Sequence, residues 1–133
     1  TPSTILRSGG PARFAIHVSR LIPGISCNIL IVDAGGQPVM NFQSRVRSPV
    51  DSHDPTIGPA FLCEVDELLL RPGHYRMDVA IIGDNVLQDF VEAAATFDVG
   101  EGYINGRPVQ PHRRVRISVP HRWTLPTPDA RVL

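Results

Sequence analysis

The chain has 133 residues, of which 42% are hydrophobic and 20% charged, and its formal net charge is zero. These values are typical of one soluble globular domain with a core of its own, and the length is tight for two. No apolar run approaches the roughly 20 residues that a membrane-spanning helix requires, and the first ten residues lack the basic and apolar regions of a signal peptide. Because the chain also begins without methionine, we interpret it as a piece cut from a longer protein, although processing would explain the same start.

Short strands are predicted throughout the first third of the chain. Thirteen prolines and eleven glycines divide the sequence into short pieces, which favours an all-β sandwich or barrel over long helices. Residues 12–20 alternate between apolar and polar, residues 25–34 are apolar on both faces as in a central strand, and residues 38–46 alternate again. In this last strand Asn41, Gln43 and Arg45 are expected to point away from the core.

The middle of the chain predicts a loop, two strands and a short helix. Residues 47–59 are polar and proline-rich, residues 60–70 resemble a strand that ends at a Pro-Gly break, and residues 74–82 alternate again. The segment 86–95 instead spaces its apolar residues by three and four, which predicts two turns of helix; these residues are Leu87, Phe90, Val91 and Ala94.

One or two further strands are expected after residue 100, most clearly at residues 115–119. Together these elements predict a single domain over residues 1–133. Its fold class is an immunoglobulin-like or jelly-roll antiparallel β-sandwich with one short helix.

The stretch around Tyr75 predicts how two of these strands are joined. In Leu70-x-Pro72-Gly73-x-Tyr75 a tyrosine follows a Pro-Gly turn at the head of a strand. This spacing is typical of a tyrosine corner, in which the ring packs in the core and the hydroxyl donates a hydrogen bond back to the preceding connection. The predicted role of Tyr75, Pro72 and Gly73 is therefore structural.

Sequence motifs for catalysis are absent. The chain has no nucleotide-binding loop, no G-x-S-x-G and no H-E-x-x-H. Residues 51–54 hold two aspartates and a histidine, but a solvated turn explains them better than a metal site. Four acids (Asp66, Glu67, Asp78 and Asp98) could in principle converge as in a glycosidase, although their spacing does not favour it. We therefore expect no enzyme activity, no metal and no cofactor.

Cysteines and charges leave alternatives open. Cys27 and Cys63 lie in apolar strand-like runs and predict buried free thiols, or one inter-sheet disulfide if the protein is exported.

Residues 64–101 carry nine acids and two arginines, whereas residues 107–122 carry five arginines and no acid. The basic stretch could contact nucleic acid or lipid. Because its arginines alternate with apolar residues, we expect it to pair with the acidic middle of its own or a sister chain.

Carbohydrate binding is the function that the outward strand faces predict. A protein grips a sugar through planar polar groups that hold hydroxyl pairs and an apolar surface that covers the C–H side of the ring. Such groups occur at Asn41, Gln43 and Arg45 on one strand, and at Arg76 and Asp78 on another. They would converge on one face if the two strands are neighbours, although ordinary solvated strand faces carry the same residue types.

The order of segments resembles a known family. A hairpin at residues 33–39 (DAGGQPV) precedes residues 65–81 (VDELLLRPGHYRMDVAI), then 87–99 (LQDFVEAAATFDV), a glycine-rich stretch (GEGYING) and the late Trp123. This order is similar to the C-terminal domain of Wzt-type proteins, the ATP-binding subunits of bacterial ABC transporters that export O-antigen polysaccharide. The resemblance covers nearly the whole chain and includes no catalytic signature.

The resemblance implies an immunoglobulin-like sandwich that dimerises by exchanging a terminal strand. It also implies a non-catalytic module that binds the finished, often chemically marked, non-reducing end of the polymer and couples it to export. The upstream ATPase domain, the membrane subunit and a location at the cytoplasmic face of the inner membrane follow from the same resemblance, and nucleic acid is not an expected partner. The alternatives are a carbohydrate-binding module of a secreted glycoside hydrolase, or a protein–protein adaptor. Should the site lie away from the two strands, Trp123 is the expected stacking surface.

Overall fold

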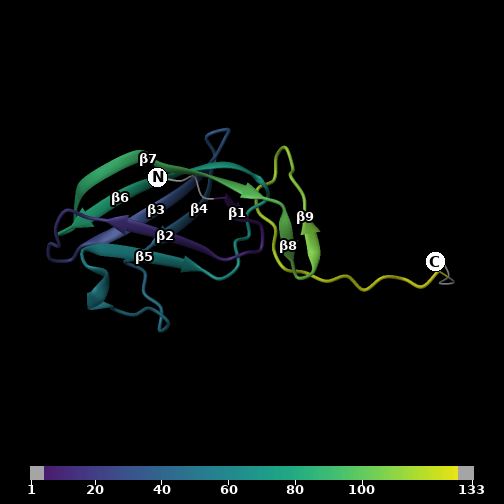
Figure 1. The fold of residues 1–133 in the computed structure, drawn as a ribbon, viewed down its shortest axis with the longest axis horizontal. Coiled ribbons are helices and arrows are strands. Elements are labelled where there is room, and N and C mark those ends of the chain that lie inside the picture. The colour runs from purple at the N-terminus through teal and green to yellow at the C-terminus, as the bar shows by residue number, and fades with distance from the viewer. Residues whose placement is uncertain (1–4, 129–133) are drawn as a thin grey trace.

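The computed structural model describes residues 5–128 and consists of two β-sheets packed face to face, with an additional hairpin at one end (Figure 1). The larger sheet has the order β1-β7-β6-β3-β4, with β1 at Ile5–Arg7, β7 at Val86–Gly100, β6 at Gly73–Gly83, β3 at Ser26–Asp33 and β4 at Pro38–Gln43. The smaller sheet pairs β2 (Ala12–His17) with β5 (Ala60–Val65), and the additional hairpin pairs β8 (Gly102–Ile104) with β9 (Arg107–Val109). The predicted all-β sandwich is confirmed.

The strand order of the large sheet is similar to that in immunoglobulin domains of the variable type, whereas the small sheet has two strands within residues 5–128 where those domains have four. There the G, F, C and C′ strands form one sheet and strands B and E belong to the other. In this chain β7, β6, β3 and β4 take the first four positions, and β2 and β5 take the other two. The sheet is mixed rather than antiparallel throughout, because β1 pairs with β7 in parallel.

The core lies between the two sheets and is built from the residues that the alternation predicts. Phe14 of the small sheet packs against Phe42 and Phe97 of the large one, with ring centroids 6.0 and 5.7 Å apart. The buried apolar residues of this cluster are Ala12, Phe14, Cys27, Ile29, Ile31, Leu68, Leu70, Tyr75, Met77, Val79, Phe97 and Val99. Such aromatic pairs between sheets fix how the two layers are seated on each other.

The helix predicted at residues 86–95 is wrong, since this segment belongs to the 15-residue strand β7. Two irregularities in its pairing with β6 explain the error. Ile82 pairs with Leu87 while Ile81 pairs with Asp89, so Gln88 is an extra residue; a second shift lies between Met77 and Val79. Each bulge resets the two-residue alternation, and the resulting spacing of apolar side chains imitates a helix. The one helical element within residues 5–128 is a 3₁₀ turn at Pro55–Ile57.

The strand predicted at residues 60–70 is shorter than expected, and the one predicted at residues 115–119 is wrong, since only an isolated bridge at Ile117 is present there. β5 ends at Val65, and the buried Leu68 and Leu70 follow in irregular chain. There Leu70 forms an isolated bridge with Ile117, and the N–H groups of Arg71 and Ser118 donate to the carbonyls of Arg116 and Leu69 at 2.7 and 2.8 Å. This isolated β-bridge, with its two backbone hydrogen bonds, attaches the C-terminal segment to the body of the domain. No helix in the described part of the chain is long and apolar enough to cross a membrane.

The hydrogen bond that defines a tyrosine corner is present. Tyr75 is 3% exposed, and its hydroxyl donates to the carbonyl oxygen of Arg71 at 2.6 Å. Its ring stacks on Phe97 with centroids 5.7 Å apart, and Gly73 lies against the same ring. Burial raises the pKa of the Tyr75 hydroxyl. The hydroxyl therefore stays protonated at neutral pH and remains a donor.

Candidate functional site

The outward face of the large sheet carries a continuous set of polar and apolar side chains. Residues directly opposite one another on paired strands point to the same side of a sheet. Asn28 pairs with Gln43 on β4 and with Ala80 on β6, and Ala80 in turn pairs with Phe90 on β7. The adjacent row through Ile29 joins Phe42 and Val79 in the core, so the row through Asn28 faces away from the small sheet.

Polar and apolar side chains are segregated along one row of this outward face. The row begins with the half-buried Gln43 and Asn28 on β4 and β3 and ends with Ala80 and the 55% exposed Phe90 on β6 and β7. The neighbouring row joins the exposed Asn41 through Leu30 to Asp78, so it is polar at both ends. The face thus offers amide groups beside an aromatic ring, the combination that sugar recognition requires.

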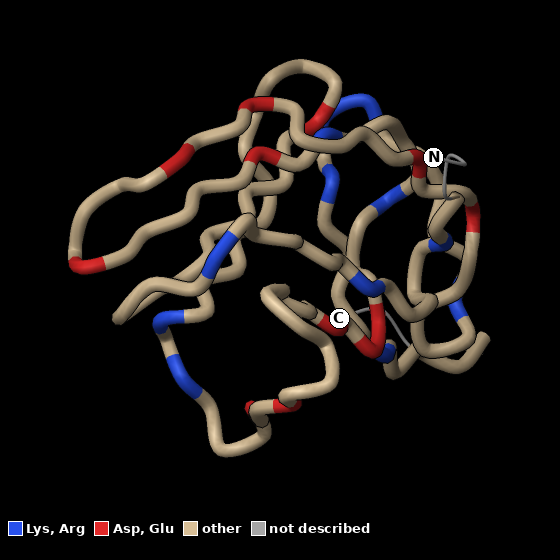
Figure 2. Tube along the Cα trace, turned by 60° about the vertical axis from the view of Figure 1, so that its left-hand side comes forward, with Lys and Arg blue, Asp and Glu red and all other residues tan. Residues whose placement is uncertain are grey.

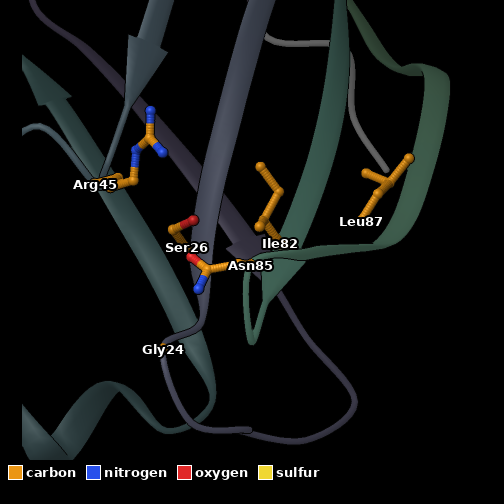
Figure 3. A pocket seen from close by; sticks show the side chains of 6 residues that line it. All are labelled: Gly24, Ser26, Arg45, Ile82, Asn85 and Leu87. Atoms are coloured by element: carbon orange, nitrogen blue, oxygen red, sulfur yellow. The ribbon is translucent and has the colours of Figure 1, made fainter.

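A cavity of about 320 Å³ lies at one end of this face. The pairing places Ser26 of β3 opposite Ile82 of β6, which is opposite Leu87 of β7. Figure 3 shows Ser26 and Asn85 in the middle of the cavity lining, with Arg45 on one side and Ile82 and Leu87 on the other. The lining, completed by Gly24, contains a guanidinium, a hydroxyl and an amide beside two aliphatic side chains.

One residue of the cavity lining, Asn85, belongs to the two-residue hairpin turn between β6 and β7. Asp84 and Asn85 both have left-handed backbones, with φ of 54° and 59°, which is the geometry of a type I′ turn. Because Asp and Asn tolerate this conformation better than most residues, the sequence fixes where the hairpin turns. The turn in turn fixes the position of Asn85 at the cavity.

The long β6–β7 hairpin is acidic along its length, as the red segments in Figure 2 show, and its acidic residues are Asp78, Asp84, Asp89, Glu92 and Asp98. Arg45 is the one charged side chain that lines the cavity.

The predicted contact residues Arg76 and Asp78 form a structural network. The Asp78 carboxylate is 5% exposed; it accepts hydrogen bonds from the backbone N–H of Ala93 at 2.7 Å and from Nε of Arg76 at 3.2 Å. Nη2 of Arg76 also lies 3.2 Å from Glu92. Asp78 therefore holds the β7 bulge, where Ala93 has a left-handed backbone (φ 52°). The expectation that Asp78 is an exposed residue is wrong, because the bulge folds over it.

The structure brings together only some of the predicted site residues. Asn41 and Gln43 share the outward face, and Arg45 lines the cavity at its end. The strands that carry the two predicted groups are not neighbours, because β3 lies between β4 and β6. Trp123 is 69% exposed and lies apart from this face, in a C-terminal stretch that extends beyond the β8–β9 hairpin (Figure 1).

The C-terminal segment is hydrogen-bonded to the body of the domain at Arg116 and is exposed from residue 119 to residue 128. Nε of Arg116 donates to the buried Asp33 carboxylate at 3.1 Å. The backbone N–H of Gln37 and the Arg116 side chain hold the pKa of Asp33 below its usual range. Asn105 Nδ2 donates to the carbonyl of His121 at 3.2 Å, and the imidazole of His121 meets Trp123 edge-on.

Reactive or metal-binding groups do not gather on the described surface. Within residues 5–128 there is no group of three or more His, Cys, Asp or Glu side chains placed to hold a metal ion. Both cysteines are free, with Cys27 in the core. Burial, and to a lesser degree the neighbouring Cys63, raises the pKa of Cys27 to about 11. Cys27 is therefore a neutral thiol at neutral pH and packs as a small apolar residue.

Several residues of this face were missed at the level of sequence, and these are Ser26, Asn28, Ile82, Asn85, Leu87 and Phe90. Phe90 and Leu87 were assigned to a helix, and Asn28 lies in a strand that is apolar on both sides. The Asp84-Asn85 pair was the signal that could have located the hairpin and with it the β7 strand.

Comparisons with models of protein families and with curated protein sequences find no match to this chain.

Proposed function

We propose that this domain is a non-catalytic carbohydrate-binding module, and that a glycan lies on the outward face of the large sheet and in the cavity at the end of that face. The observation that carries the proposal is one row of that face, which joins the amides of Gln43 and Asn28 through Ala80 to the exposed Phe90. Amides and a guanidinium hold pairs of hydroxyls, and the ring of Phe90 covers the apolar face of a sugar.

The end of the sandwich at which the cavity lies supports a binding role. In variable-type immunoglobulin domains the B–C and F–G loops meet at one end and carry the recognition residues. Gly24 follows β2 and precedes β3, and Asn85 lies in the turn between β6 and β7, so the cavity sits between the corresponding two connections. This support is an analogy of position, since a sandwich fold by itself specifies no ligand.

The resemblance to Wzt-type proteins supplies the identity of the glycan in this proposal. The polymer is O-antigen polysaccharide, and the part bound is its non-reducing end. The domain would then work at the cytoplasmic face of the inner membrane, joined to an ATPase domain and, through it, to the membrane subunit of the transporter. Free thiols at Cys27 and Cys63 are compatible with a reducing compartment.

Substitutions in the cavity and on the outward face are expected to weaken glycan binding without unfolding the domain. Arg45→Ala should lower the affinity for purified O-polysaccharide by about five- to 150-fold, since a lost polar contact that leaves a partner unpaired costs about 1–3 kcal/mol. Phe90→Ala should also weaken binding, because it removes the ring that covers the apolar face of the sugar. Both side chains are exposed, so melting temperatures should stay close to that of the wild type. Titration calorimetry measures the first quantity and thermal unfolding the second.

Arg13→Ala is the matched control, because Arg13 is an exposed arginine on β2 of the small sheet. It should bind the polymer like the wild type. Polymer that lacks its terminal residue should bind more weakly to the unaltered domain. Equal binding of complete and shortened polymer would contradict recognition of the chain end, and absence of binding to any glycan would favour a protein–protein adaptor.

We also propose that the domain is a homodimer that exchanges its C-terminal segment. The segment that holds the exposed Trp123 and Leu125 extends from the body (Figure 1), and its arginines are opposite in charge to the acidic β6–β7 hairpin. An exposed apolar segment that extends from the body can pair with a second copy of the chain.

A chain that ends at Pro120 tests the dimer, because it keeps the pairing of residues 116–118 with residues 69–71 and removes Trp123 and Leu125. Sedimentation velocity should show a dimer for the full chain and a monomer for the shortened one, with similar melting temperatures. A monomer in both cases, or a dimer in both, would contradict exchange through this segment.

A further inference from the structure

We propose that the β8–β9 hairpin carries a second glycan contact, centred on Tyr103. This inference rests on the proposed function, which concerns the outward face of the large sheet and the cavity at its end. A cavity of about 280 Å³ lies between the end of β1 and the hairpin, and its side chains include Arg7, Glu101, Tyr103, Pro108 and Gln110.

The hairpin divides into a face that packs on the body and a face that meets solvent. Ile104 and Val109 are buried toward the body, whereas Tyr103 is 67% exposed. Tyr103 pairs directly with Pro108, so both side chains lie on the solvent side. The hairpin thus presents an aromatic ring and a proline ring side by side, although neither is needed for the core.

Backbone contacts hold this hairpin in a fixed position. A Cβ added to Gly102 would lie 2.0 Å from the carbonyl oxygen of Ser8, and one added to Gly9 would lie 1.8 Å from that of Tyr103. The two backbones therefore approach so closely that only glycine fits at either position. Ser8 is itself buried and donates from Oγ to the carbonyl of Leu70 at 2.6 Å. A ring mounted on such a support is preorganised for binding.

The chemistry around the ring suits a sugar. Arg7 donates from Nη1 to the carbonyl of Glu101 at 3.2 Å, which fixes the guanidinium beside the cavity. Together with the Glu101 carboxylate and the Gln110 amide, the Arg7 guanidinium supplies hydrogen-bond donors and acceptors in planar groups, of which one is positive, one negative and one neutral. Such groups hold the hydroxyls of a neutral sugar ring. A proline-rich peptide would require a groove with several aromatic residues, and Tyr103 is the one aromatic side chain in this lining.

The two cavities lie at opposite ends of the molecule. The turn between β6 and β7 is at one end and the β8–β9 hairpin at the other (Figure 1). A long polymer can contact both regions, on one copy or on two, whereas a short oligosaccharide fills only one. Contact at both places raises the apparent affinity for the polymer through a high effective concentration.

The test compares two ligands and three variants. The ligands are purified O-polysaccharide of the bacterium that encodes the chain and a short oligosaccharide from its terminal repeat. Tyr103→Ala should bind the polymer about tenfold more weakly and the oligosaccharide with unchanged affinity, because only the polymer reaches the hairpin. Tyr103→Phe should retain polymer binding, and Arg45→Ala should weaken binding of both ligands.

Amide spectra of the labelled wild-type domain give an independent measurement. Polymer, and not oligosaccharide, should shift the signals of Tyr103, Val109 and Gln110. The hairpin contact is overturned, and the proposed function stands, if three results occur together. The wild type binds both ligands, Tyr103→Ala binds the polymer with the affinity of the wild type, and the polymer does not shift the signals of these three residues. If the wild type binds neither ligand, the proposed function is overturned and this contact with it.

Discussion

Tyr75→Ala is expected to lower the free energy of unfolding by about 3–5 kcal/mol, which is the usual cost of truncating a large buried side chain. The ring is 3% exposed and stacks on Phe97, which itself packs against Phe14 of the other sheet. Removing it therefore leaves a cavity between the layers and frees the Arg71 carbonyl. Urea unfolding followed by circular dichroism measures the change.

Two further variants separate the ring from the hydroxyl. Tyr75→Phe removes only the donor to Arg71 and should cost about 1 kcal/mol, the scale of one hydrogen bond. Tyr103→Ala removes an exposed tyrosine and should shift stability by no more than about 0.5 kcal/mol. An alanine variant at Tyr75 that unfolds at the same urea concentration as the wild type would show that the corner does not hold the two sheets.

Much of the sandwich could be predicted from local pattern. Alternation assigned Phe14 on one strand, and Tyr75, Met77 and Val79 on another, to the core, because each strand buries only one of its faces. The corner motif placed a hydrogen bond that the structure shows. These features depend on neighbours in sequence or on a single turn, and such signals are visible in one chain.

The errors arise where pairing between distant strands overrides local spacing. The β7 bulges at Gln88 and Ala93 interrupt the alternation, and a bulge is fixed by the partner strand rather than by the segment itself. For the same reason the outward face was only partly predicted. Phe90 belongs to it through register with Ala80, and no spacing within residues 86–95 indicates that register.

Asp78 shows that the inward–outward alternation of a strand does not by itself predict whether a side chain is exposed. Its position opposite Leu30, which also pairs with Asn41, places it on the outward face as predicted. There the bulge of β7 covers the carboxylate and directs the N–H of Ala93 at it. The Asp78 side chain, which the sequence pattern assigns to ligand binding, thus stabilises the bulge of β7 on the outward face.

Asp78→Ala is accordingly expected to destabilise the domain, and to affect glycan binding only as a consequence. The substitution removes the carboxylate that accepts the partly buried hydrogen bond from the Ala93 N–H, and it removes one of the two acidic partners of Arg76, the other being Glu92. A hydrogen bond to a charged group contributes about 1.5–3 kcal/mol, and the strained left-handed backbone at Ala93 loses the contact that holds it. Asp78→Asn keeps an oxygen for the Ala93 N–H and should cost clearly less, while Asp89→Ala on the same hairpin removes an exposed carboxylate and should shift stability by at most about 0.5 kcal/mol. Urea unfolding orders the three variants, and hydrogen exchange at Ala93 should speed up only where the acceptor is lost. Wild-type stability of Asp78→Ala together with loss of glycan binding would instead make this carboxylate a direct ligand contact.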